Sequence, residues 1–238
     1  MMPNAVLFDL DDTLHDDTAA YHGAADEVAN EAAFEYGINA RELKAAYVAQ
    51  ADRFWHGLGV SQLSIPMATI RHELWKNALA EVGVTDEARV VACAERYVRA
   101  RAKRLVLFPG ARELLDSLKR QAIQTGLITN GYSETHREKI ALLGLAQSFD
   151  AIFIANEVGM LKPDPLFFAH ACAELGSSPA RTVMVGDRYD RDIAGAHEAG
   201  IRTIWFNIRC EPLPTGKQPP DEMVNDLAAV QRILLKER

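Results

Sequence analysis

From Leu105 onward the sequence repeats one pattern, in which a short apolar stretch is followed by a loop and then by a helical segment. This alternation predicts parallel strands joined by helical crossovers, because a parallel neighbour can only be reached through a long connection. The predicted strands are Val6–Phe8, Ile123–Ile128, Ala151–Ile154, Thr182–Val185 and Thr203–Phe206. The predicted helices between them are Ala111–Arg120, Ser133–Leu143, Pro165–Leu175 and Asp192–Ala199. The fold class is therefore α/β, with a doubly wound parallel sheet covered by helices on both faces.

The tail of the chain is expected to end this pattern. Its stretch Glu211–Pro220 is rich in proline and predicts a loop, and a short helix is expected at Asn225–Leu235.

A block of about ninety residues separates the first predicted strand from the others, and its pattern is helical throughout. The predicted helices are Thr18–Tyr36, Asn39–Trp55, Pro66–Val82 and Thr85–Arg104. Gly37 and Gly83 stand where helices are expected to stop. We therefore expect an α/β core formed by residues 1–17 and 105–238, with an all-helical cap domain, 18–104, inserted into it.

Composition excludes several classes of protein. The 238 residues carry a formal net charge of −7 and show no long stripe of Lys and Arg, which argues against a nucleic-acid-binding protein. No stretch is long and apolar enough to span a membrane, and the chain starts with a strand rather than a signal segment. Cys93, Cys172 and Cys210 lie far apart, which fits a reducing compartment. We expect a cytoplasmic protein.

The run VLFDLDDTL, residues 6–14, places Asp9 and Asp11 two positions apart at the end of the first predicted strand. Residues i and i+2 of a strand point to the same side, so both carboxylates are expected to converge on one point. Crowded acids repel each other, and a divalent cation offsets that cost. A strand followed by an acidic loop that caps a helix explains the same residues equally well when the run is taken alone.

Three later strand ends also carry polar residues. Thr129-Asn130-Gly131 follows the second predicted strand, Lys162 lies after the third, and Gly186-Asp187 ends the fourth, with Asp192 five residues further on. Each has an ordinary structural explanation: a strand exit, a solvated lysine, a turn, or an acid at a helix start. Ligands of open parallel sheets bind at the carboxyl ends of the strands, so the joint pattern predicts one site.

With these four segments the chain resembles the haloacid dehalogenase superfamily, most of whose members are phosphohydrolases. Asp9-Leu10-Asp11-Asp12-Thr13 matches its first motif, Leu127-Ile128-Thr129 its second, Lys162 its third, and Gly186-Asp187 through Asp192 its fourth. The stretches FPGARELLDSLK and LITNGYSETHREKIALLGL resemble members with a helical cap between the first two motifs.

The resemblance implies a role for each residue. Asp9 would be the nucleophile that forms an aspartyl-phosphate, and Asp11 the general acid and base. Mg²⁺ would bind the Asp9 carboxylate, the Asp11 backbone carbonyl and Asp187. Lys162, Thr129 and the backbone N–H of Asn130 would hold the phosphoryl oxygens. Asp192 would orient Lys162 or a metal-bound water.

The expected function is hydrolysis of a small phosphate monoester, either a nucleoside monophosphate or a sugar phosphate. Dehalogenation is disfavoured because dehalogenases of the superfamily lack the second acid, which is present here as Asp11. Two alternatives stay open: a phosphosugar mutase on the same scaffold, and a non-catalytic binding protein. Leaving-group specificity is expected to come from the cap, whose residues Trp55, His56, His72 and Trp75 are more simply explained by packing or helix-dipole interactions.

Overall fold

The computed structural model describes residues 2–235 and divides the chain into two compact units. The core unit comprises Met1–Asp16 and Leu107–Arg238, and the helical unit comprises Asp17–Val106. Two segments connect the units, and they lie together within the core: the backbone N–H of Phe108 donates to the carbonyl of Leu14 at 3.0 Å, and His15 forms a bridge with Leu107. The helical unit is therefore inserted at a single place, directly after the first strand and its turn.

The core unit contains one six-stranded parallel sheet, in the order β3-β2-β1-β4-β5-β6. The strands are β1 (Ala5–Phe8), β2 (Gln124–Thr129), β3 (Ala151–Ile154), β4 (Thr182–Gly186), β5 (Arg202–Phe206) and β6 (Glu222–Val224). This confirms the doubly wound parallel sheet. β1 lies between β2 and β4, so the strand order reverses there, which is the position where such sheets bind ligands.

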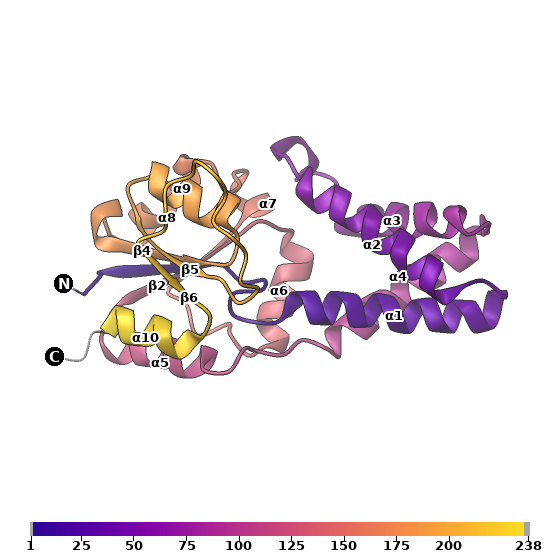
Figure 1. Cartoon of the computed structure of the whole chain (residues 1–238), viewed down its shortest axis with the longest axis horizontal. Helices are drawn as coiled ribbons and strands as arrows, with labels where there is room; N and C mark the ends of the chain where they lie inside the picture. The colour runs from indigo at the N-terminus through magenta and orange to yellow at the C-terminus, as the bar shows by residue number, and fades with distance from the viewer. Residues whose placement is uncertain (1, 236–238) are drawn as a thin grey trace. The chain divides into compact units, whose positions relative to one another are not determined.

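Helices cover both faces of the sheet (Figure 1). α5 (Ala111–Arg120), α6 (Ser133–Leu142) and α10 (Leu227–Leu235) form one layer, where Arg112 of α5 donates to the carbonyl of Leu143 at 2.8 Å, just past the end of α6. α8 (Pro165–Glu174) and α9 (Ala194–Glu198) form the opposite layer. α7 (Ala155–Val158) is a single turn after β3, and a π-helical turn, Tyr189–Ile193, precedes α9.

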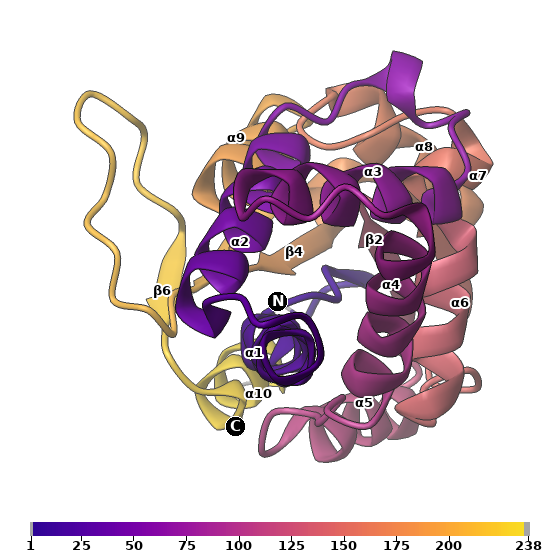
Figure 2. The same cartoon turned by 90° about the vertical axis from the view of Figure 1, so that its right-hand side faces the viewer.

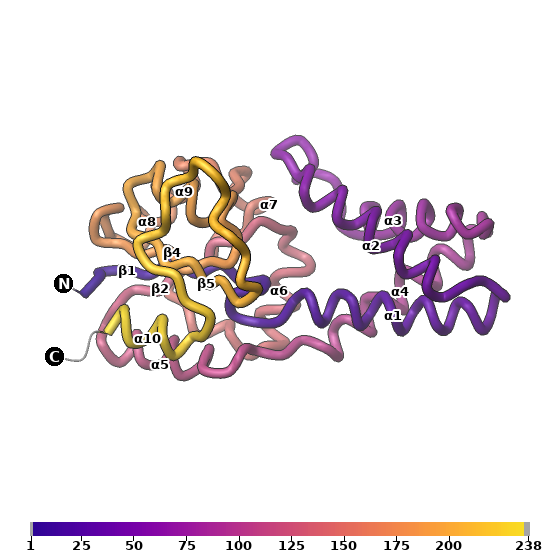
Figure 3. The backbone as a smooth tube through the Cα atoms, viewed as in Figure 1, coloured from indigo at the N-terminus to yellow at the C-terminus, as the bar shows by residue number. Residues whose placement is uncertain are grey.

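β6 was not expected from the sequence. It has only three residues, none of them buried, so it lacks the apolar signal of a covered strand. A long loop joins β5 to β6, and in Figure 3 it is seen in front of the sheet and of α9. Figure 2 shows that it projects from the core unit before it returns to β6.

The helical unit consists of α1 (Asp17–Tyr36), α2 (Ala40–His56), α3 (Met67–Glu81) and α4 (Glu87–Ala102), seen with α1 nearly end-on in Figure 2. The side chains of Asn39 and Asp86 cap α2 and α4. The fourth helix, α4, therefore begins at Glu87, two residues later than the predicted start at Thr85. Gly37 and Gly83 lie at the predicted helix ends with φ of 69° and 81°.

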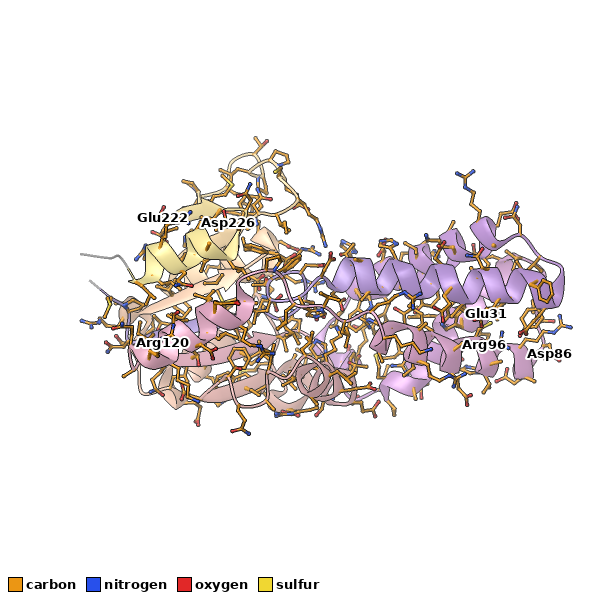
Figure 4. All side chains as sticks on the ribbon, turned by 90° about the horizontal axis from the view of Figure 1, so that it is seen from below. Glu31, Asp86, Arg96, Arg120, Glu222 and Asp226 are labelled. Carbon is orange, nitrogen blue, oxygen red and sulfur yellow. The ribbon has the colours of Figure 1, made fainter. Side chains whose placement is uncertain are left out.

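Aromatic side chains fill the centre of the helical unit. The rings of Tyr47 and Trp75 stack with centroids 4.0 Å apart, and Tyr97 packs against both. Trp75 is fully buried, in keeping with a packing role. At the surface, Arg96 of α4 reaches Glu31 of α1 at 3.6 Å (Figure 4). Across residues 2–235, no helix combines the length and apolar character needed to cross a membrane.

Candidate active site

The chain turns sharply after β1, and this turn separates the two acids of the first motif. The backbone N–H of Asp9 still donates to the carbonyl of Val185 at 3.0 Å. Asp12 then adopts a φ of 59°, and its N–H donates to the carbonyl of His15 at 2.9 Å. β1 itself ends at Phe8, so Asp9 and Asp11 do not alternate along a strand as the sequence suggested. Their carboxylates therefore contact different groups.

The ammonium of Lys162 lies between the carboxylates of Asp9 and Asp192, near the carboxyl ends of β1 and β4. The Nζ of Lys162 lies 2.6 Å from a carboxylate oxygen of Asp9 and 2.6 Å from one of Asp192. All three side chains are buried. A buried ammonium is costly unless it is paired, and here two carboxylates share it. The other oxygen of Asp192 accepts the backbone N–H of Arg188 at 3.0 Å, which fixes the carboxylate.

Asp190 has no such contacts with this cluster. Its side chain is 62% exposed and pairs with Arg188 on the surface. Of the two acids that follow Asp187, the structure therefore brings only Asp192 to the buried lysine.

Asn130 holds the backbone of Lys162 in place. Its side-chain amide donates to the carbonyl of Lys162 and accepts its N–H, both at 2.7 Å. Asp164 then caps α8 by accepting the N–H of Leu166 at 2.9 Å. Thr129, the last residue of β2, is buried directly before Asn130. The sequence predicted a phosphate contact for the backbone of Asn130; the structure adds a bracing role for its side chain.

Asp187 completes a cluster of acids with Asp9 and Asp192, whose carboxylate oxygens lie within 4.8 Å of one another. The Oδ1 of Asp187 is buried and has no hydrogen-bond partner among the described residues. A Cβ built on Gly186 would approach the Cγ of Asp192 to 2.4 Å, so only glycine allows this close packing. Hard carboxylate oxygens gathered in this way suit Mg²⁺, and the residues present therefore fit the ion.

Burial and crowding of these carboxyl groups raise the pKa values of Asp9 and Asp187. Burial, reinforced by the charges of Asp192 and Asp11, raises the pKa of Asp9 to about 7 although Lys162 opposes the shift. Burial and the charges of Asp9 and Asp192 likewise hold the pKa of Asp187 well above its usual range. The carboxylates therefore resist ionisation together, and a bound cation would favour their charged forms.

Asp11 lies among basic side chains. The Nζ of Lys139 donates to both of its carboxylate oxygens, at 2.8 and 2.7 Å, and the Nε2 of His15 lies 2.8 Å from one of them. The Nε2 of His136 lies 3.4 Å from the other. Burial alone would raise the pKa of Asp11, but the charges of Lys139 and His136 outweigh it and hold that pKa well below its usual range.

Lys139 and His136 were not anticipated from the sequence as site residues. Both belong to α6 and are buried. They share one helix face with Tyr132 and Leu143, at spacings of three and four residues. A lysine and a histidine in the apolar register of a helix are the signal that could have revealed them.

The chain is similar to known hydrolases in sequence and in fold. A family model described as haloacid dehalogenase-like hydrolase matches residues 3–200. Phosphoserine phosphatase from Thermus thermophilus is 31% identical, over 94% of this chain and 96% of that protein. N-acylneuraminate-9-phosphatase from Mus musculus is 29% identical, over 97% of this chain and 93% of that protein. The crystal structure of the HAD-hydrolase YfnB from Bacillus subtilis bound to magnesium has a similar fold, with a TM-score of 0.78 and 24% identity over 98% of this chain and 99% of that one.

The chain belongs to the haloacid dehalogenase-like hydrolase family. Within it, the chain is a phosphoric monoester hydrolase, as its relatives are phosphatases and nucleotidases.

Proposed function

We propose that this protein is a Mg²⁺-dependent phosphatase that hydrolyses a small phosphate monoester through an aspartyl-phosphate on Asp9. The observation that carries the proposal is the buried arrangement in which Asp9 lies 2.6 Å from Lys162 and within 4.8 Å of the acids Asp187 and Asp192. An aspartate placed between a cation and a cluster of oxygen ligands is suited to attack an anionic phosphoryl group.

In the first step an Oδ atom of Asp9 attacks phosphorus and the bond from phosphorus to the ester oxygen breaks. Asp11, whose pKa is held low in the free site, takes up a proton from solvent when the substrate binds and gives it to the departing oxygen, so an alcohol leaves and the phosphoryl group stays on Asp9. In the second step water attacks the phosphorus and transfers a proton to Asp11. The bond to Asp9 breaks, inorganic phosphate is released and both carboxyl groups return to their starting forms.

Three groups are assigned to the phosphoryl oxygens. The ammonium of Lys162 neutralises negative charge, while Thr129 and the backbone N–H of Asn130 donate hydrogen bonds. The position of Lys162 depends on Asp192, which shares its ammonium, and on Asn130, which holds its backbone. Two separate contacts thus support the one lysine that the reaction needs.

Asp9, Asp187 and the backbone carbonyl of Asp11 are proposed to hold the metal. Bound there, Mg²⁺ would supply positive charge that reduces the repulsion between an anionic nucleophile and an anionic substrate. Asp192 completes the acidic cluster but already pairs with Lys162, so we assign it to the support of that lysine.

The substrate class that we propose is a nucleoside monophosphate or a sugar phosphate. The relatives named for acting on small phosphorylated compounds, such as pyrimidine 5'-nucleotidase PynA from Streptococcus pneumoniae, support a substrate of this size. The core recognises the phosphoryl group, so we assign selection of the leaving group to the helical unit. We also propose a cytoplasmic setting, since Cys93, Cys172 and the exposed Cys210 are all free thiols.

The test is phosphate release from a panel of nucleoside monophosphates, sugar phosphates and p-nitrophenyl phosphate, with Mg²⁺ and with EDTA. Release that requires Mg²⁺ supports the proposal, and the preferred compound identifies the substrate class. Asp9→Asn serves as the inactive control for contaminating phosphatases. Absence of release, together with isomerisation of a sugar phosphate, would replace hydrolysis by a mutase reaction.

A further inference from the structure

The carboxylate of Asp11 is held by basic side chains from two parts of the core unit. Lys139 comes from α6, and its Nζ contacts both oxygens of Asp11 at 2.7 and 2.8 Å. His15 comes from the turn after β1, and its Nε2 lies 2.8 Å from one oxygen. A carboxylate bound at both oxygens from two directions cannot rotate freely about its last bond.

The side chain of Lys139 is buried where it contacts Asp11. Its side chain is only 5% exposed, whereas the carboxylate that it binds is 28% exposed. A lysine usually keeps its ammonium in water, and burial in a protein requires a partner. Asp11 provides that partner with two hydrogen bonds, so Lys139 and Asp11 constrain each other.

His136 connects this contact to the loop that carries the phosphate-binding residues. A Cβ built on Gly131 would lie 1.9 Å from the ring of His136, so the ring packs directly on the glycine that follows Asn130. The same ring lies 3.4 Å from Asp11. The position of Asp11 is therefore tied to α6 and to the end of β2 at once.

We propose that Lys139 is a positioning residue that, with His15, orients the carboxylate of Asp11 for proton transfer to the departing oxygen. It acts through Asp11 and makes no contact with the phosphoryl group in this role. The inference rests on the proposed phosphatase function and deepens it. In this role Lys139 affects only the proton-transfer step. Its substitution should therefore lower kcat more for a substrate whose leaving group needs a proton than for one whose leaving group does not.

The test compares two substrates in four proteins: wild type, Lys139→Met, Asp11→Asn and the double variant. An alkyl phosphate has a leaving group that needs a proton, and p-nitrophenyl phosphate has one that does not. For Lys139→Met we expect kcat on the alkyl phosphate to fall by about 10–100-fold, as is typical when a supporting contact is removed. We expect kcat on p-nitrophenyl phosphate to fall by less than about threefold and KM to change little on either substrate.

The double variant separates positioning from other roles. If Lys139 acts through Asp11, adding Lys139→Met to Asp11→Asn should produce little further loss, because the group that it orients is already disabled. Lys139→Arg keeps the charge and the hydrogen bonds and should restore part of the alkyl phosphatase activity. The matched control is Lys119→Met, which removes an exposed lysine of the neighbouring helix α5 and should leave both activities unchanged.

Equal losses on the two substrates, a change confined to KM, or full additivity with Asp11→Asn would overturn the proposal. If Lys139→Met shows no cooperative thermal transition, His15→Phe is measured in its place, since it removes another hydrogen bond to Asp11, and the same criteria apply. A wild-type protein that releases no phosphate from any compound of the panel contradicts the proposed function itself. An active wild type with an unchanged substrate ratio in the variants contradicts only the inference.

Discussion

The side chain of Asn130 makes two hydrogen bonds to the backbone of Lys162, one as donor and one as acceptor, both at 2.7 Å. The two residues are 32 positions apart and belong to loops that follow different strands. This pair therefore connects the end of β2 to the loop that carries the buried lysine. With its backbone held in this position, the ammonium of Lys162 lies 2.6 Å from Asp9.

Replacement of Asn130 by alanine should therefore impair catalysis through Lys162. We expect kcat/KM to fall by about 10–100-fold, the usual range for a residue that supports a group in direct contact with the reaction. Asn130→Asp keeps the hydrogen-bond acceptor and loses the donor, so a smaller fall in kcat/KM is expected. Steady-state kinetics on the best substrate of the panel measures both.

Asn39→Ala is the matched control for this prediction. Asn39 accepts backbone N–H groups at the start of α2, within the helical unit. Its loss should cost about 1 kcal/mol of helix stability and leave kcat unchanged at temperatures where the protein is folded. Equal effects of the two substitutions on kcat would show that Asn130 acts on stability alone.

Asp9→Asn should abolish turnover without unfolding the protein. The amide keeps the shape of the carboxylate but cannot form the aspartyl-phosphate, so we expect a loss on the order of 10³-fold or more. Because the substitution also removes one charge from a buried acidic cluster, the melting temperature in EDTA should rise or stay unchanged. Asp190→Asn, which changes an exposed acid two positions before Asp192, should keep full activity. Wild-type turnover in Asp9→Asn would remove the covalent mechanism.

The parallel sheet could be predicted from the sequence because its five longer strands are apolar and alternate with helices. β6 could not, since three residues that are not buried carry no periodic signal. The strand ends likewise indicated Asp9, Lys162, Asp187 and Asp192, which the structure brings together. Spacing along the chain predicts a shared edge of a sheet in this way, because parallel strands all end on the same side.

The surroundings of Asp11 depended on tertiary contacts and could not be predicted. Lys139 is 128 positions from Asp11 in the sequence. Its place in the apolar register of α6 indicates burial, but nothing local identifies Asp11 as its partner. The expected convergence of Asp9 and Asp11 also assumed that β1 continued through both, whereas it ends at Phe8. The turn gives the two acids different partners, which is what two different chemical roles require.

Asp11→Asn should discriminate between leaving groups. An alkoxide needs a proton to depart, so kcat on an alkyl phosphate should fall by roughly 10²–10⁴-fold, the usual contribution of general acid and base catalysis. Nitrophenolate departs without a proton. The fall in kcat on p-nitrophenyl phosphate should therefore be at least tenfold smaller if the first step limits the rate. A burst of nitrophenol in rapid-mixing experiments would show that breakdown of the phosphoenzyme has become limiting. Identical losses on both substrates, with no burst, would contradict the acid role of Asp11.

Mg²⁺ should stabilise the fold, and more strongly as the pH rises from 6 to 8. The pKa of Asp9 is raised to about 7, and that of Asp187 is raised well above its usual range. Between the unfolded aspartate pKa of about 3.9 and these raised values, the metal-free native state binds more protons than the unfolded chain, so its free energy of unfolding falls as the pH rises. A cation displaces those protons, so its own binding strengthens over the same interval.

Thermal unfolding in EDTA and in increasing Mg²⁺ at pH 6, 7 and 8 measures this linkage. At pH 8 and a Mg²⁺ concentration of 100 times the dissociation constant at that pH, the increase in melting temperature should be on the order of 5–10 °C, and the same Mg²⁺ concentration at pH 6 should give a smaller increase. Asp187→Asn removes one proposed ligand and should lose most of that increase, whereas Asp190→Asn should keep it. An increase of the same size at pH 6 and pH 8 would mean that the ion binds without displacing protons from these carboxyl groups, and the acidic cluster would then not be its site.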